Sequence, residues 1–260
     1  MMARLLPYIS FVVLLLVMCM AAQAGTGRTP DDEVNALHEI AKQVGKKDWN
    51  FTVDPCINES SWNTPKSNLT PLYNNSLICD CSYPHGVCHV VQLFLRGQDL
   101  SGVLPPSLVK LPYLKTMSIA VNNLSGPIPS FLGNISTLVY MSLESNLFSG
   151  TVPPELGNLV NLVNLILNAN NLTGDLPFAL TKLTKLTELR ISSNNFTGRM
   201  PDFFRSWKHL EKLEIQASGF EGPIPSSISI LSNLTELDLS FNELVGEVPN
   251  LAGLTNLESM

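Results

Sequence analysis

Apolar residues recur along positions 90–249 with a constant spacing of 24 residues. The recurring pattern is L-x-x-L-x-L-x-x-N-x-L-S/T-G-x-I-P, with other apolar residues replacing leucine in several copies. Its clearest copy runs from Leu162 to Pro177. The copies begin at Val90, Leu114, Leu138, Leu162, Leu186, Leu210 and Leu234. A repeat of this length predicts a chain of stacked, equivalent units, each of which contacts mainly its neighbours.

Each repeat carries the signals for one short strand and one turn. The fourth and sixth positions are apolar and alternate with polar neighbours, which is the period of a strand. The glycine that follows turns the chain, and the proline after it opens a segment where we expect a short helical turn on the convex side. The sequence therefore predicts an α/β repeat fold, a leucine-rich-repeat solenoid with seven repeats over 90–249 and an incomplete eighth repeat over 250–260.

Two sets of positions should form the interior of this solenoid. The asparagine at position nine can bond neighbouring backbone from inside the turn, but repeats one and six carry Gln98 and Ser218 there, so we expect a weaker or water-filled ladder at those two points. The asparagines are Asn122, Asn146, Asn170, Asn194 and Asn242. The inward apolar pairs are Leu93/Leu95, Met117/Ile119, Met141/Leu143, Leu165/Leu167, Leu189/Ile191, Leu213/Ile215 and Leu237/Leu239.

The chain begins with the features of an exported protein. Arg4 precedes an apolar run that ends at Met20, and Ala22-Gln23-Ala24 is a small-x-small cleavage site. These features predict a signal peptide over 1–24 that is cleaved after Ala24. An uncleaved membrane anchor is the alternative, but the apolar run is short for a spanning helix and the cleavage site follows it at once.

Residues 25–89 should form an N-terminal cap on the repeats. The segment Thr29-Pro30-Asp31-Asp32-Glu33 is typical of a helix start, with a hydroxyl cap, a proline in the first turn and acids near the positive helix end. We therefore expect a helix over about 30–44 that begins at the Thr29 cap and ends at Gly45. Its apolar face should lie on the first repeat.

Four cysteines of the mature chain lie close together: Cys56, Cys79, Cys81 and Cys88. An even number of cysteines in an exported protein indicates two disulfides. A link between Cys79 and Cys81 would strain the intervening backbone, and both other connectivities stay open. The alternative is a zinc site formed by Cys79, Cys81 and Cys88 with His85 or His89, but this spacing matches no common zinc pattern.

Nine N-x-S/T sequons are glycosylation acceptors in an exported chain. They begin at Asn50, Asn58, Asn68, Asn74, Asn123, Asn134, Asn171, Asn195 and Asn233. The alternative is that an asparagine-rich repeat produces sequons by chance.

The net charge is mildly acidic, with 16 basic and 22 acidic residues. The sequence has no basic cluster or stripe, so we do not expect a nucleic-acid partner. We also expect no cofactor and no metal.

Several segments resemble one family. The cap carries Asp48-Trp49-Asn50-Phe51, Asp54-Pro55-Cys56, Cys79-Asp80-Cys81 and Cys88-His89-Val90, and the repeats carry the plant-type L-S-G-x-I-P extension. With Leu111-Pro-Tyr-Leu-Lys115 and Ile215-Gln-Ala-Ser-Gly219, these segments resemble the extracellular region of plant leucine-rich-repeat receptor-like serine/threonine kinases. The most similar subgroup has a malectin-like domain after the repeats. The resemblance covers nearly the whole chain.

The resemblance implies the order signal, repeats, malectin-like domain, transmembrane helix and cytoplasmic kinase. This sequence carries only the first two parts and lacks the kinase motifs, so we expect no enzyme activity in it. No closing cap follows the last repeat, and we expect a truncated product, a fragment or a splice form. The implied location is the extracellular face of the plasma membrane, with membrane contact only through absent C-terminal regions; a chain that ends at Met260 would be secreted.

The implied function is ligand recognition, and the implied partners are a peptide, a glycan or a co-receptor protein at the cell surface. On the concave face, exposed aromatic and apolar groups beside charges are the best candidates for contact. These candidates are Phe94, Arg96, Tyr140, Ile166 and Arg190. The wider set of expected contacts includes Ser118 and Ser142.

Two other functions are compatible with this architecture. A secreted decoy receptor, or an inhibitor of a wall-degrading enzyme, would use the same solenoid, although leucine-rich-repeat inhibitors of polygalacturonase end in a closing cap. An enzyme could use Glu214, Glu236 and Asp238 for glycoside chemistry. An open, wet groove, however, offers no burial to raise the pKa of one carboxylate. We therefore favour the receptor ectodomain.

Overall fold

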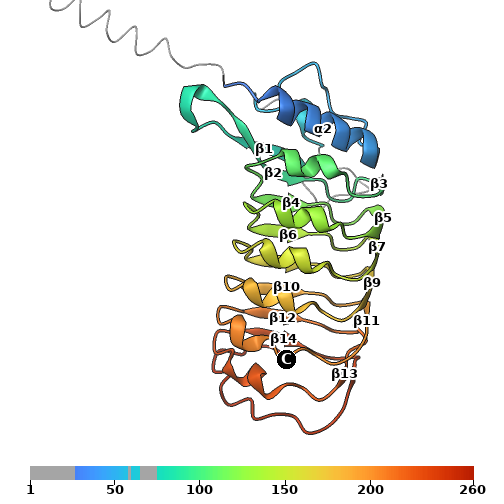
Figure 1. Cartoon of the computed structure of the whole chain (residues 1–260), viewed down its shortest axis with the longest axis vertical. Coiled ribbons are helices and arrows are strands. Elements are labelled where there is room, and N and C mark those ends of the chain that lie inside the picture. Colours follow the sequence, from blue (N-terminus) through green and yellow to red (C-terminus); the bar gives the residue numbers. More distant parts are fainter. Residues whose placement is uncertain (1–26, 58–59, 65–74) are drawn as a thin grey trace, which may run out of the picture.

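The computed structural model describes residues 27–57, 60–64 and 75–260. The predicted signal peptide over 1–24 and the sequons at Asn58, Asn68 and Asn74 lie outside these ranges. The described residues form an elongated stack of repeats, with the N-terminal helix at one end and the last residues at the other (Figure 1). The predicted leucine-rich-repeat solenoid is confirmed.

The largest sheet in the described part of the chain has eight strands in the order β1-β2-β4-β6-β8-β10-β12-β14. β1 is antiparallel to β2, and the other neighbours are parallel. The register is one repeat, because Leu93 pairs with Met117 and Met117 pairs with Met141. The strands are β1 (Ser76–Asp80), β2 (His89–Phe94), β4 (Thr116–Ser118), β6 (Tyr140–Ser142), β8 (Asn164–Ile166), β10 (Glu188–Arg190), β12 (Lys212–Glu214) and β14 (Glu236–Asp238).

A second set of short parallel strands follows the turn in each repeat. Five of these strands form a sheet in the order β11-β9-β7-β5-β3, which runs along the right-hand edge of the stack in Figure 1. They are β3 (Ser101–Gly102), β5 (Asn123–Pro127), β7 (Leu147–Gly150), β9 (Asn171–Gly174) and β11 (Asn195–Phe196). Strands β13 (Glu221–Gly222) and β15 (Glu243–Leu244) pair with each other. We call the five-stranded sheet the flank sheet.

The expected helical turns are 3-10 helices. In most repeats the helix starts directly after the extended proline of the repeat, because the fixed φ of proline sets the entry of the chain into the turn. These helices are η3 (Pro106–Lys110), η4 (Ser130–Asn134), η5 (Pro154–Asn158), η6 (Phe178–Lys182), η7 (Phe204–Ser206) and η8 (Ser226–Ile230). Two more, η1 (Ser60–Trp62) and η2 (Pro84–Gly86), lie in the cap.

The predicted inward pairs form the core between the large sheet and the 3-10 helices. All of their members are at most 3% exposed except Leu239, which is half-buried near the C-terminal end. Every layer of this core is closed only by the layers beside it, as expected for a repeat array.

The predicted asparagine ladder is also confirmed. Asn122 shows the pattern: its Oδ1 accepts the N–H groups of Gln98 and Leu100, and its Nδ2 donates to the carbonyl groups of Leu95, Ile119 and Ala120. One side chain therefore satisfies backbone groups of its own repeat and of the preceding one. Asn146, Asn170, Asn194 and Asn242 make equivalent bonds.

At repeat six, different groups form the ladder, and they make fewer bonds than an asparagine does. The Ser218 hydroxyl donates to the carbonyls of Ile191 and Gln216, and the backbone carbonyl of Ser218 accepts the Phe196 N–H at 2.8 Å. At repeat one, by contrast, neither the amide nitrogen nor the amide oxygen of the Gln98 side chain has a hydrogen-bond partner in the described part of the chain.

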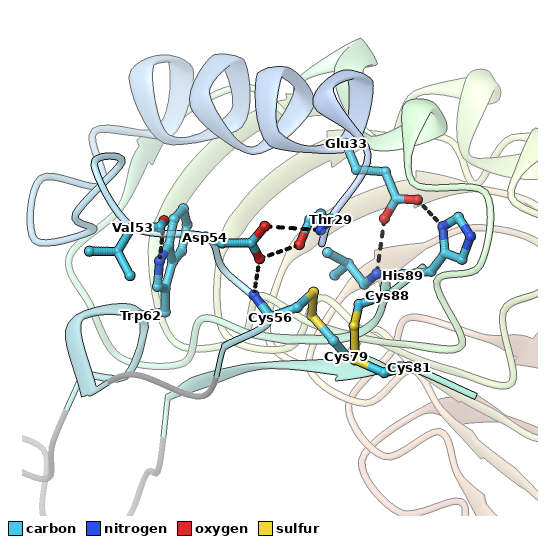
Figure 2. Close-up of a disulfide and its surroundings, with 11 residues drawn as sticks. Thr29, Glu33, Val53, Asp54, Cys56, Trp62, Cys79, Cys81, Cys88 and His89 are labelled. Carbon is cyan, nitrogen blue, oxygen red and sulfur yellow. Dashed lines mark hydrogen bonds and ion pairs between the residues drawn. A yellow bond between two sulfur atoms is a disulfide. The ribbon is translucent and has the colours of Figure 1, made fainter. Parts of the chain in front are cut away.

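The N-terminal helix α2 spans Asp31–Val44 and lies over the first repeat (Figure 1). Gly45 ends it in the left-handed conformation with φ 78°, as predicted. The predicted Thr29 cap is wrong, because Pro30 occupies the N-cap position and no side chain caps the helix. The Thr29 hydroxyl instead donates to Asp54 at 2.7 Å, and Asp54 also accepts the Cys56 N–H, so this threonine ties the helix start to the cysteine segment (Figure 2).

A buried carboxylate joins α2 to the first strand of the repeats. Glu33 is 1% exposed, and its Oε2 accepts the Val90 N–H at 2.9 Å. Its other oxygen contacts His89 Nδ1 (Figure 2). Next to this pair, the His89 ring packs against Tyr113 with a centroid distance of 4.0 Å. Helix, cap and first repeat are thus held together by polar as well as apolar contacts.

The disulfides join Cys56 to Cys79 and Cys81 to Cys88 (Figure 2). This is one of the two connectivities that the sequence left open. All four sulfur atoms are used, so none is left for the zinc alternative. Among the described residues, no helix is long and apolar enough to cross a membrane.

Candidate functional site: the concave sheet

The large sheet arranges the concave side chains in straight rows. Parallel pairing with a register of one repeat places equivalent residues of successive strands beside one another. The row at position five runs through Phe94, Ser118, Ser142, Ile166, Arg190, Glu214 and Asp238. Position three forms a second row that contains Tyr140, and position seven a third that contains Arg96. The five predicted site residues therefore share one face: Phe94, Tyr140, Ile166 and Arg190 lie on four different strands, and Arg96 follows β2.

The middle of this face is less accessible than the sequence suggests. Ile166 is only 6% exposed, so it does not present the exposed apolar surface that we expected of it. Ser118 and Ser142 are 0% exposed, and their hydroxyl groups have no hydrogen-bond partner among the described residues. Fully buried hydroxyl groups offer no surface to a ligand in this arrangement. Phe94 and Tyr140 remain half-buried and accessible.

Arg190 lies between two acidic side chains. Its Nε is 2.5 Å from Glu188 Oε1 on the same strand and 3.3 Å from Glu214 Oε1 on the next strand. Glu188 also accepts a hydrogen bond from Asn164 Nδ2 at 2.5 Å. The arginine is 29% exposed, so one edge of this paired guanidinium can still reach a ligand.

A second charged pair lies in the position-three row, farther toward the C-terminal end. Lys212 Nζ donates to Glu236 Oε1 at 2.6 Å. This hydrogen bond raises the pKa of Lys212 above its ordinary value. Asp238 accepts bonds from its near neighbour Ser240. Charge of both signs is therefore concentrated on strands β10, β12 and β14.

At the N-terminal end, Arg96 forms an ion pair across a whole repeat. Its Nη2 is 3.4 Å from Glu144 Oε2, two repeats away, and the two side chains bridge over Ala120, which is 0% exposed. A small residue in the middle repeat leaves room for this bridge. The concave face thus changes from aromatic and sparsely charged over repeats one to three to densely charged over repeats five to seven.

Sequence reasoning placed Arg96 and Arg190 on this face but did not predict that they pair with acidic side chains. The available signal was opposite charge at equivalent positions of neighbouring repeats, such as Arg190 with Glu214. Two of the three acids considered for glycoside chemistry are in ion pairs, since Glu214 contacts Arg190 and Glu236 contacts Lys212. In the ranges described, no group of three or more histidine, cysteine, aspartate or glutamate side chains is arranged to hold a metal ion.

Two family models match the repeats that form this face. The model described as "Leucine rich repeat" matches residues 184–244, and the one described as "Leucine Rich Repeat" matches 137–159. The chain is a leucine-rich-repeat solenoid.

The solenoid is also similar to plant receptor kinases. A probable leucine-rich-repeat receptor-like serine/threonine-protein kinase of Arabidopsis thaliana is 39% identical over 120 residues, which is 44% of this chain and 12% of that protein. A second probable kinase of this kind from the same plant is 42% identical over 96 residues, 36% of this chain and 9% of that protein. The chain thus spans only about a tenth of the length of these curated relatives.

Among solved structures, the solenoid is similar to the leucine-rich-repeat ectodomain of the Arabidopsis thaliana membrane receptor kinase GASSHO1/SCHENGEN3, which was solved in complex with CASPARIAN STRIP INTEGRITY FACTOR 2. That ectodomain is 30% identical with a TM-score of 0.73, over 87% of this chain and 25% of the other. The chain is therefore similar to the leucine-rich-repeat ectodomains of plant receptor kinases.

Proposed function

We propose that this solenoid is the ligand-recognition part of a plant cell-surface receptor-like kinase and that it binds an extended peptide along the concave sheet. The observation that carries the proposal is the row arrangement of that sheet, which offers accessible aromatic groups and paired charges at a regular spacing. Adjacent parallel strands lie about 4.8 Å apart. An extended peptide that crosses the strands can therefore meet a new set of side chains at each repeat.

The comparisons support this proposal. The plant peptide hormone receptor RGFR1, solved in complex with RGF2, is 32% identical to this chain with a TM-score of 0.62, over 67% of this chain and 28% of that receptor. Peptide is therefore the first ligand class to test, and a glycan or a co-receptor protein is the alternative partner. In this proposal catalysis belongs to other parts of a longer protein. Export, a malectin-like domain and truncation stay predictions.

The concave face can be tested with a displayed library of short random peptides. We expect selection on the purified, secreted chain to enrich peptides that bind the wild type. Tyr140→Ala and Arg190→Ala should each weaken an enriched synthetic peptide by about tenfold or more, which is the effect of losing a central contact. Lys182→Ala on the convex helix η6 is the control and should leave binding unchanged. Enriched peptides that bind all variants equally would contradict a concave binding site.

A secreted decoy receptor or inhibitor is the alternative function, and it predicts a different gene. Sequencing of the full transcript across the codon for Met260 separates the two. A reading frame that continues into a membrane span and a kinase supports the receptor. A stop codon at that point would favour the secreted form.

A further inference from the structure

The flank sheet carries three of the sequons in one structural position. They are Asn123-Leu-Ser on β5, Asn171-Leu-Thr on β9 and Asn195-Phe-Thr, which begins on β11. Each starts at position ten of its repeat, directly after the buried asparagine of the ladder. Strands β9 and β11 are neighbours, and β7 separates β9 from β5. The three sequons therefore lie on one side of the solenoid.

The strand conformation turns the reactive parts of these sequons outward. Successive side chains of a strand point to opposite faces. The middle residue of each sequon points into the core, where Leu124 and Leu172 are 0% exposed and Phe196 is 2% exposed. The acceptors Asn123, Asn171 and Asn195 are all exposed. An attached sugar would thus leave the core undisturbed.

The hydrogen bond of the Asn123 side chain is compatible with glycosylation. Asn123 Nδ2 donates to Asp99 Oδ1 at 2.5 Å. Glycosylation replaces only one of the two hydrogens on Nδ2, so the other can still donate to Asp99. Between β5 and β9, Leu147 of β7 is 58% exposed on the same face. This large apolar side chain would be covered by sugars on the strands beside it.

We propose that Asn123, Asn171 and Asn195 carry N-linked glycans that cover the flank sheet and keep protein partners off this side of the solenoid. In the reaction, a bond forms between asparagine Nδ2 and the anomeric carbon of an oligosaccharide. The bond from that carbon to a lipid pyrophosphate carrier breaks, and Nδ2 loses one proton. The inference rests on the proposed function, because it requires export through the compartment that holds this donor.

Site occupancy provides the first test. The full chain is expressed in plant cells with its own N-terminus. The secreted protein is treated in heavy-oxygen water with an amidase that hydrolyses the side-chain amide of glycosylated asparagine, so each formerly glycosylated asparagine becomes a labelled aspartate. Mass spectrometry should find the label at all three flank positions. Ser125→Ala, Thr173→Ala and Thr197→Ala should each remove one glycan. Ser149→Ala is the matched control, since β7 has the same hydroxyl but Leu147 in place of the acceptor, and it should change nothing.

The possible failures are distinguishable. Label at Asn50, Asn134 or Asn233 with none at the flank positions would overturn the glycan cover while leaving export intact. A chain that stays inside the cell without any glycan would overturn the proposed function as well.

Coverage is tested separately from occupancy. Leu147→Lys places a reactive amine in the middle of the flank sheet, and Thr116→Lys places one on the concave face. A bulky amine-reactive reagent should modify position 147 several-fold faster after enzymatic removal of the glycans, whereas position 116 should react at the same rate before and after. Equal rates at position 147 would show that the glycans leave the flank open and would overturn the proposal.

Discussion

Repeats one and six both lack the asparagine of position nine, but they differ in how they manage without it. At repeat six, the hydroxyl and the backbone carbonyl of Ser218 take over the bonds to the preceding repeat. At repeat one, Gln98 has the longer amide side chain, yet neither of its polar atoms finds a partner in the described ranges. An amide side chain at position nine is therefore neither necessary nor sufficient for bonds between neighbouring repeats.

The neighbouring glycine explains why repeat six succeeds. Gly219 has φ 86°, and a Cβ atom built on it would lie 2.4 Å from the Phe196 carbonyl oxygen. Without a side chain, the backbone of repeat six can approach repeat five closely enough for the Ser218 carbonyl to reach the Phe196 N–H. Repeat one has Asp99 at the equivalent position and lies against the cap, where β1 is antiparallel, so no equivalent backbone partner is presented.

The largest effect should come from breaking an intact part of the ladder. Asn146→Ala removes the acceptor of the buried Leu124 N–H and three bonds to carbonyl groups. We expect the free energy of unfolding to fall by about 3 kcal/mol, since a buried polar group is left unpaired. Urea unfolding followed by circular dichroism measures this. The exposed Asn158 is the control, and Asn158→Ala should cost less than about 0.5 kcal/mol.

Gly219→Ala tests the substitute at repeat six. We expect a loss of about 2 kcal/mol from the positive φ and the clash with Phe196 together. Gly150→Ala separates the two causes, because Gly150 also has a positive φ but its nearest neighbour would be 4.0 Å from the new Cβ. Equal losses in the two variants, measured by urea unfolding, would show that the close approach is unimportant.

A smaller gain is expected at position eight. Val121 has φ 57°, where a β-branched residue is strained, whereas repeat one has Gly97 at this position with φ 61°. Val121→Gly should therefore raise the free energy of unfolding by about 1 kcal/mol, visible as a higher melting temperature. Val139→Gly, on a strand-side position without positive φ, should lower it by a similar amount. A destabilised Val121→Gly protein would mean that the valine contacts outweigh its strain.

The smallest effect is expected for Ser218→Asn. This variant distinguishes a gap in the ladder at repeat six from a ladder whose bonds Ser218 already supplies. If the ladder simply had a gap there, Ser218→Asn would stabilise the protein. Because the Phe196 N–H is already bonded, we expect a change below about 0.5 kcal/mol in the same urea experiment. A gain of a full kilocalorie would restore the sequence-based expectation.

Local periodicity explains what the sequence could predict. The inward pairs, the position-nine asparagines and the prolines before the 3-10 helices recur with similar surroundings in successive repeats. One clear copy of the repeat therefore predicts the structure of the others. The Thr29 hydroxyl shows where this fails. Its partner is Asp54, in a non-repeating segment 25 residues away, and no local pattern predicts that contact.

The candidate site was predictable as a face but only partly as a set of residues. Strand alternation places Phe94, Tyr140 and Arg190 on the concave side. The burial of Ile166 depends on the side chains beside it in the rows, and the pairing of Arg190 depends on acids of two strands. To predict either feature, residues at equivalent positions of neighbouring repeats have to be compared, because the pattern within one repeat does not include these contacts.

The short reach of the contacts has a consequence for biogenesis. The disulfides close loops of 23 and 7 residues, and strand pairs join residues one repeat apart. A nascent chain can therefore complete its oxidised N-terminal end while later repeats are still on the ribosome, and each new repeat can add to a finished template. Order of synthesis and order of assembly would then coincide, and the slow thiol chemistry would come first.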